Sequence, residues 1–174
     1  MEAPDIHIRQ AGPSDIALIR AMADVVFRKT YSDILSPDQM EFMMEWMYSA
    51  DSLAIQVNSA GKYFFIAEKG GVPAGYVSFE EEGAAPSGMK LFHLQKLYIM
   101  PGFQGQGLGR AMLDFVKEKL RSICPGGCRV ELNVNRHNNA VGFYEHYGMK
   151  RVRQGDFPIG NGFYMNDYIY CFEL

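Results

Sequence analysis

Residues 104–109 read Gln104-Gly105-Gln106-Gly107-Leu108-Gly109, between a strand-like run, Phe92 to Ile99, and a helix-like run, Leu108 to Arg121. The first turn of a helix carries unpaired N–H groups and the positive end of the helix dipole. A glycine-rich turn at that point lets the backbone close around a phosphate. The stretch therefore predicts a pyrophosphate-binding loop, with all six of these residues as contacts.

The spacing of the glycines separates three kinds of phosphate-binding loop. A dinucleotide fingerprint, Gly-x-Gly-x-x-Gly, would need its third glycine where Arg110 stands, and Gly109 comes one place early. A Walker loop ends in Gly-Lys-Ser/Thr, whereas Gly107 is followed by Leu108. Both nucleotide-binding interpretations are therefore excluded.

The remaining pattern resembles the Gln/Arg-x-x-Gly-x-Gly/Ala motif of the GCN5-related N-acetyltransferases (GNAT), with Gln104, Gly107 and Gly109 in the defining places. A later segment, Asn138 to Met149, resembles the second signature of that family. In this signature an asparagine comes before Ala-x-x-Phe-Tyr, and a glycine then ends the helix. The two segments follow in the order of the family. The joint resemblance covers the chain from about Tyr63 onward.

For the fold, the resemblance implies one α/β (α+β) domain over residues 1–174. We expect a mixed, mostly antiparallel sheet of about seven strands and about four helices, in the order β-α-α-β-β-β-α-β-α-β-β. Gly70-Gly71 and Asn161-Gly162 favour tight hairpin turns. The expected strands are 6–10, 62–68, 73–79, 92–99, 129–134, 149–154 and 164–172, and the expected helices begin near residues 16, 40, 108 and 139.

Acetyl transfer to an amine needs a base and an acid. An alkyl amine with a pKa near ~10.4 is only ~0.04% neutral at pH 7, so a base must take its proton before it attacks a thioester. By the motif match, Tyr144 is implied to be the acid that protonates the departing sulfur. The base is left open between His93, Glu131 and water; an imidazole accepts and releases protons near neutral pH.

The resemblance implies acetyl-CoA as cosubstrate and no metal. The strand that holds Leu97, Tyr98 and Ile99 is expected to splay from its neighbour, so that its backbone pairs with the pantetheine arm. Asn138 is implied to bond the cofactor amide or else to cap the following helix, and we expect it to serve one role at a time. Arg110 either assists the phosphates or points to solvent.

The composition of the chain limits the kinds of partner that it is expected to bind. The chain has a formal net charge of −3, which argues against a broad nucleic-acid or anionic-membrane surface, and no apolar run approaches a membrane span. Met1 to Asp5 lacks a basic-then-apolar signal, so a cytoplasmic location is expected. Cys124 and Cys128 could form half a metal site, but no second ligand pair follows at finger-like spacing, which favours a loop of free thiols. Whether the protein forms a homodimer stays open.

The acceptor is expected to be a small-molecule amine, polyamine-like first and an amino-acid or peptide amine second. Overall acidity and the carboxylates Asp156 and Asp167 are compatible with a cationic amine, and the end segment looks like bacterial polyamine-type acetyltransferases. Glu80-Glu81-Glu82 is expected to be a solvated charge run. The methionine stripe at 40, 43, 44 and 47 is interpreted as a core-facing helix or as a wall of the acceptor channel.

Two other functions remain as alternatives to this enzyme. One is a non-catalytic acetyl-CoA-binding sensor module, which would need the glycine loop but no placed acid such as Tyr144. The other is an acyltransferase for a longer acyl-CoA, which depends on pocket size.

Overall fold

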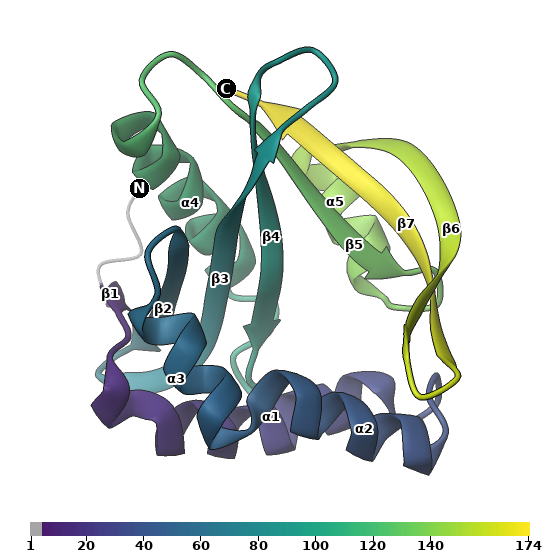
Figure 1. Cartoon of the computed structure of the whole chain (residues 1–174). Helices are drawn as coiled ribbons and strands as arrows, with labels where there is room; N and C mark the ends of the chain where they lie inside the picture. The colour runs from purple at the N-terminus through teal and green to yellow at the C-terminus, as the bar shows by residue number, and fades with distance from the viewer. Residues whose placement is uncertain (1–4) are drawn as a thin grey trace.

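The computed structural model describes residues 5–174, with a single sheet covered by helices on both faces (Figure 1). The start of the chain, on which the expected cytoplasmic location rests, lies outside the described residues apart from Asp5. The strands are β1 (Ile6–Gln10), β2 (Lys62–Lys69), β3 (Val72–Ala84), β4 (Lys90–Ile99), β5 (Arg129–Asn135), β6 (Lys150–Gly160) and β7 (Phe163–Glu173). The helices are α1 (Ile16–Tyr31), α2 (Pro37–Tyr48), α3 (Ala50–Asn58), α4 (Leu108–Ile123) and α5 (Ala140–Tyr147), with a 3₁₀ turn at Pro13–Asp15.

The sheet has the order β1-β2-β3-β4-β5-β7-β6, and its neighbours are antiparallel except for β4 and β5. Helices α4 and α5 cover one face, where Leu113, Val116 and Tyr144 belong to one apolar core. Helices α1, α2 and α3 cover the other face around a second core that includes Phe27 and Tyr76. The predicted mixed, mostly antiparallel sheet is confirmed.

The parallel ladder between β4 and β5 is short. It joins only Leu91, Phe92 and His93 to Arg129, Val130 and Glu131. Beyond His93 the two strands diverge, as Figure 1 shows between β4 and β5. The expected splay beside residues 97–99 is therefore present, and it leaves one edge of β4 without a strand partner among the described residues.

A β-bulge in β4 sets which side chains face the α1–α3 side. Phe79 is paired with Leu94 and Ser78 with Lys96, so Gln95 is the extra residue. A bulge bends its strand and changes the side on which the following residues lie. Leu94 belongs to the core beneath α4, whereas Lys96 is buried beside Gln56 of α3. The bulge thus brings two polar residues in succession, Gln95 and Lys96, toward the same face.

Turn chemistry is as the sequence predicts. Gly70 and Gly71 have φ of 58° and 79° in the β2–β3 hairpin, and Asn161 and Gly162 have φ of 53° and 77° between β6 and β7. Positive φ at both central residues is what a tight hairpin turn of this kind requires. Gly148, with φ of 106°, ends α5 as expected.

Helix α3 is absent from the predicted order, which is wrong at this point. It follows α2 directly, with Ser49 ending one helix and capping the next through a 3.2 Å bond from Ser52 N. Its apolar residues Ala50, Leu53, Ala54 and Val57 recur at helical spacing and Ser49 is a capping residue, so the sequence held a signal for this helix.

The run Glu80-Glu81-Glu82 is exposed at Glu81 and Glu82, as expected of a solvated run, but it also forms contacts that the sequence does not predict. These residues lie within β3, which extends to Ala84, and each faces a partner on an adjacent strand. Glu80 pairs with Lys62, Glu81 with Lys90, and Glu82 lies 3.4 Å from His93 Nδ1. Cross-strand pairing, which a single sequence does not reveal, is the reason.

Within residues 5–174, every helix is too short or too polar to cross a lipid bilayer.

Candidate functional site

Where β4 and β5 part, a narrow opening of about 30 Å³ separates the two strands. We call it the strand slot. Its walls include Leu97 and Tyr98 from β4, Asn138 before α5, and Tyr144 from α5. The structure therefore brings together four of the predicted site residues from three separate segments of the chain.

A larger cavity of about 250 Å³ lies on the α1–α3 side of the sheet, and we call it the central cavity. It shares Tyr31, Gln95, Tyr98 and Asn133 with the strand slot, so the two are adjoining spaces. Apolar and aromatic side chains form much of its wall, and polar side chains of β3, β4, β5 and β7 line the rest. Its lining includes Phe27, Met43, Trp46, Met47, Phe157, Ile159 and Met165.

The methionine stripe of α2 takes both roles that the sequence left open. Met40 and Met43 are buried in the second core, which fits the core-facing interpretation. Met43 and Met47 also line the central cavity. One helix face thus supports the core at one end and forms a cavity wall at the other.

His93 lines the central cavity, as a residue that acts on a ligand there would have to. Its Nδ1 lies 3.4 Å from Glu82 Oε1, and this contact lowers the pKa of Glu82 against the opposing effect of burial. A carboxylate at this distance orients the imidazole ring. His93 therefore lines the cavity with its Nδ1 side turned toward Glu82.

Glu131, the competing base, is the register partner of His93 but does not line the central cavity. Its carboxylate is bound by Arg153 at 2.7 Å and by Arg129 at 2.8 Å. Burial alone would raise the pKa of Glu131, but the two arginines outweigh burial and hold it below its usual value. A carboxylate in this state is a poor proton acceptor near neutral pH.

Asp167 of β7 lines the central cavity, and one of its carboxylate oxygens lacks a hydrogen-bond partner among the described residues. Its Oδ2 accepts a 3.2 Å bond from Asn133 Nδ2, whereas the buried Oδ1 has no hydrogen-bond partner among the described residues. Burial raises the pKa of Asp167, and the Asn133 bond opposes that shift only in part. A buried carboxylate oxygen without a partner is costly, so this atom is suited to accept a bond from a cationic ligand.

Tyr144 is buried, with 6% of its surface exposed, and it lines the strand slot from the α5 side. Burial raises the pKa of Tyr144 above the usual range of a phenol. Its hydroxyl stays protonated at neutral pH as a result and can donate a hydrogen bond or a proton there.

Asn138 uses both ends of its amide, and the cap of the following helix is one of the two roles expected of it. Its Oδ1 accepts a 2.9 Å bond from Ala140 N at the start of α5. Its Nδ2 donates at 3.3 Å to the hydroxyl of Tyr31, which is also 3.2 Å from the hydroxyl of Tyr98. The helix start thus fixes an amide donor in the strand slot.

The glycine-rich loop is exposed and leads into α4. Gly105 and Gly107 have φ of 73° and 83°, a region that side chains with a Cβ avoid. The first backbone bond of the helix runs from Ala111 N to Gly107 O at 3.0 Å. The N–H groups of Leu108 and Gly109 come before it and have no partner within the helix, so they form an anion-binding end.

Gly109 also has a packing role between α4 and α5. A Cβ there would lie 2.9 Å from the ring Cζ of Phe143, so Gly109 lets α4 pack closely against α5. Arg110 lies over the ring of Tyr147 at 5.1 Å, in a cation–π contact, rather than pointing freely to solvent. Both residues join the two helices that flank the slot.

The glutamines of the loop form bonds that shape it. Gln104 Nε2 donates to Ile99 O at 3.3 Å, which ties the loop to the end of β4. Gln106 donates to Gly102 O at 3.0 Å and accepts from Lys69 Nζ at 2.6 Å. Ile99 contacts the α4 core and does not line the slot, in contrast to Leu97 and Tyr98.

Three residues that the sequence did not single out occupy the junction of slot and cavity: Tyr31, Gln95 and Asn133. Asn133 stands among apolar residues of β5, and such a polar interruption of a strand was the available signal. Tyr31 ends an amphipathic helix and gave none.

The cysteines and other possible ligands do not form a metal site. Cys124 donates to Gly127 O at 3.1 Å in the loop after α4. Residues 5–174 contain no group of three or more His, Cys, Asp or Glu side chains placed to hold a metal ion.

The chain was compared with known proteins. A family model described as an acetyltransferase (GNAT) domain matches residues 31–166. An uncharacterized N-acetyltransferase of Lactobacillus delbrueckii subsp. lactis is 26% identical over 162 residues, which cover 90% of this chain and 91% of that protein. The PaiA N-acetyltransferase of Thermoplasma acidophilum, solved in complex with coenzyme A, has a TM-score of 0.75 at 20% identity and covers 95% of this chain and 97% of its own. A GCN5-related N-acetyltransferase of Rhodopseudomonas palustris has a TM-score of 0.77 at 22% identity. The match covers 100% of this chain and 99% of that protein.

Proposed function

Since the chain belongs to the GNAT acetyltransferase family, we propose that it transfers an acetyl group from acetyl-CoA to a primary amine by direct attack in a ternary complex. Residues 1–174 would act as one N-acetyltransferase domain. The observation that carries the choice of acceptor is Asp167, which lines the cavity beside the strand slot and has one buried carboxylate oxygen without a partner among the described residues.

The donor side of the proposal rests on the slot and the loop. Acetyl-CoA supplies an activated thioester when bound. The free edge of β4 at Leu97 and Tyr98 would pair with the pantetheine arm, as an added strand does, and the Asn138 amide would reach it from across the slot. The N–H groups after Gly107 would hold the pyrophosphate.

The acceptor amine would enter from the central cavity. Asp167 and Glu82 would attract its ammonium form, and His93 would take its proton either directly or through water. The neutral amine then forms a bond to the thioester carbon, the carbon–sulfur bond breaks, and Tyr144 donates its proton to the sulfur. The second proton that the nitrogen loses as it becomes an amide returns to the Tyr144 oxygen. Because the carboxylates of Asp167 and Glu82 would attract cations, polyamine-like molecules are the first class of acceptor to test, and amino-acid or peptide amines are the second.

Two alternatives make different demands on the same groups. A sensor that only binds acetyl-CoA has no need of an unsatisfied carboxylate in an adjoining cavity, so Asp167 favours the enzyme. A transferase for longer acyl chains would need an apolar extension of the strand slot.

The test is a panel of primary amines assayed with acetyl-CoA by release of free thiol. We expect acetylation of at least one amine, and an Asp167→Asn variant with an amine KM raised about ten-fold or more at nearly unchanged acetyl-CoA affinity. Asp33→Asn, at an exposed aspartate, is the matched control. Coenzyme A binding without transfer to any amine would favour the sensor instead.

A further inference from the structure

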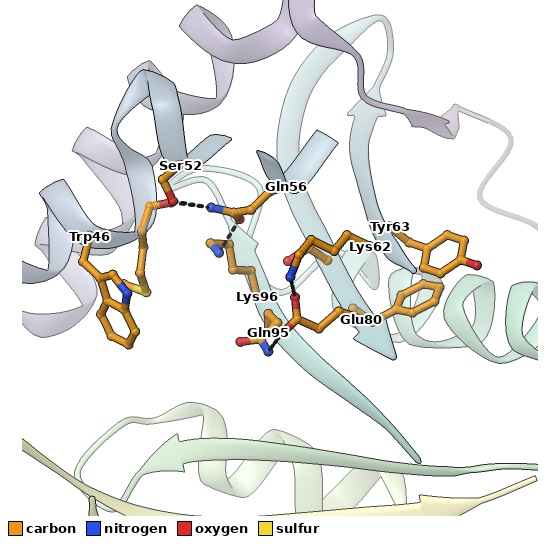
Figure 2. A pocket seen from close by; sticks show the side chains of 11 residues that line it. Trp46, Ser52, Gln56, Lys62, Tyr63, Glu80, Gln95 and Lys96 are labelled. Atoms are coloured by element: carbon orange, nitrogen blue, oxygen red, sulfur yellow. Dashed lines mark hydrogen bonds and ion pairs between the residues drawn. The ribbon is translucent and has the colours of Figure 1, made fainter. Parts of the chain in front are cut away.

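A second cavity, of about 160 Å³, lies beside the central cavity on the same side of the sheet. We call it the Lys96 cavity, and Figure 2 shows Lys96 and Gln56 facing one another within it. Lys96 Nζ donates to Gln56 Oε1 at 2.6 Å. Gln56 is held in this orientation because its Nε2 donates to Met47 O at 2.8 Å and to Ser52 Oγ at 3.0 Å.

Lys96 is an ammonium without a counter-ion. Only 6% of its surface is exposed, and it forms no ion pair within residues 5–174. An ammonium has three donors, of which one is used by Gln56, and the ring of Tyr48 at 5.4 Å adds a weak attraction. Buried charges are normally paired, so two donors of Lys96 are available to an anion.

A second polar group in the same cavity also lacks a partner. Ser78 is 5% exposed, and its Oγ has no hydrogen-bond partner among the described residues. Ser78 and Lys96 are register partners on β3 and β4, so their side chains share one side of the sheet. A hydroxyl donor therefore lies beside the unpaired ammonium.

The carboxylate nearest to this pair is already engaged. Glu80 binds Lys62 and accepts a 2.9 Å bond from Gln95 Nε2, and Figure 2 shows the three side chains linked. The cavity thus contains two cations and one anion, and its unbalanced charge is that of Lys96. A single negative charge on the ligand would balance it.

The Lys96 cavity adjoins the central cavity. The two share Trp46, Met47 and Gln95 as lining residues. His93 and Lys96 lie on the same strand three residues apart, which corresponds to about 10 Å along β4. A small extended molecule can therefore place its amine near His93 and its other end near Lys96.

We propose that the Lys96 cavity binds a carboxylate, and that the acceptor is a primary amine that carries a carboxylate at its far end, as amino acids with a side-chain amine do. The inference rests on the proposed function and selects within it, in favour of the amino-acid class over the polyamine class. A diamine would place its second ammonium beside Lys96, where two positive charges repel each other.

The experiment compares three acceptors of similar length that differ only at the far end: ε-aminocaproate, its amide, and hexamethylenediamine. With acetyl-CoA saturating, we expect kcat/KM to be at least about ten-fold higher for the acid than for the amide, and lowest for the diamine. A kcat/KM for the amide or the diamine that equals or exceeds that of the acid overturns the proposal.

Two lysine variants locate the effect. In Lys96→Met, which keeps the side-chain length, the acid-to-amide ratio should fall to about one. In Lys90→Met, at an exposed lysine of the same strand, the ratio should stay as in the parent. A ratio that survives in Lys96→Met shows that the carboxylate binds elsewhere. If Lys96→Met does not fold, Ser78→Ala serves instead, and it should reduce the ratio several-fold.

Calorimetric titration with butyrate separates this inference from the proposed function, because butyrate has no amine. We expect butyrate to bind the parent and Lys90→Met but not Lys96→Met. If none of the three amines is acetylated and butyrate still binds in this pattern, the proposed acceptor class fails while the carboxylate site stands. Absence of butyrate binding to the parent refutes the site.

Discussion

His93 and Glu131 are register partners in the short parallel ladder between β4 and β5, yet they belong to different charge networks. His93 faces the central cavity with Glu82 3.4 Å away. Glu131 is neutralised by Arg129 and Arg153. Proximity along the sheet therefore does not make the two residues equivalent candidates for the base, and the surroundings of each favour His93.

The different surroundings of His93 and Glu131 should be visible in the pH dependence of catalysis. The kcat/KM of the parent should rise between about pH 6 and 8, and His93→Ala should remove that rise and recover in part at higher pH, where more neutral amine is supplied. Glu131→Gln should keep the rise, because this substitution removes the ion pairs with Arg129 and Arg153 but leaves the proton acceptor, His93, in place. If Glu131→Gln flattens the profile and His93→Ala leaves it unchanged, the base is Glu131.

Tyr144→Phe should leave coenzyme A affinity intact and lower kcat on the order of 10²-fold, the usual scale for the loss of a general acid. Because burial raises the pKa of Tyr144, its own ionisation should produce no falling limb in the parent profile between about pH 7 and 10. Single-turnover measurements check that chemistry is the step observed. An unchanged single-turnover rate would reduce Tyr144 to a packing residue.

Much of the fold follows from local patterns. The alternation at Ile6 to Gln10 predicted β1 with its observed bounds, and the helix signals after Ser36 and Gly107 predicted α2 and α4. These elements carry their own caps and periodic apolar residues. Helix α3 has such a pattern too, with Ser49 as its cap and Leu53 and Val57 on one face, but it is short and only Leu53 is fully buried, so its signal is weaker.

The site was predictable only in part. The loop at Gln104 to Gly109 and the position of Tyr144 are sequence motifs, so they could be named in advance. The unpaired oxygen of Asp167 and the unpaired ammonium of Lys96 depend on what lies opposite each of them in space. The bulge at Gln95, which brings Lys96 to the α3 side, is a property of strand pairing.

The two motif glycines should fail in different ways. Gly107 has φ of 83° and open space around it, so Gly107→Val should strain the loop and weaken coenzyme A binding more than it lowers Tm. In Gly109→Val the new Cβ would meet Phe143, and overpacking of this kind costs about 1–3 kcal/mol. Gly109→Val should therefore lower Tm, and Phe143→Leu should restore it.

Calorimetry of coenzyme A binding and thermal unfolding of the same samples separate the two effects. Tight coenzyme A binding by Gly107→Val would remove the pyrophosphate role from this loop. A Tm for Gly109→Val equal to that of the parent would show that α4 and α5 can move apart without cost.

The last prediction concerns how stability changes with pH at Lys96. Burial lowers the pKa of Lys96 from 10.5 to about 8. Between these two values the unfolded chain holds a proton at this site that the folded protein has released, so the contribution of Lys96 to stability rises with pH. Below about pH 8 both states are protonated, and folding carries the full cost of burying the charge, on the order of 3 kcal/mol.

Lys96→Met removes that cost. The difference in free energy of unfolding between Lys96→Met and the parent should therefore favour the variant most at pH 7, and it should decline as pH rises from about 8 to 10.5. Lys150→Met, at an exposed lysine, should show no such decline. Denaturant unfolding of the three proteins across this range measures the difference directly. A constant difference between Lys96→Met and the parent would mean that Lys96 stays protonated in the folded protein, which requires an anion beside it.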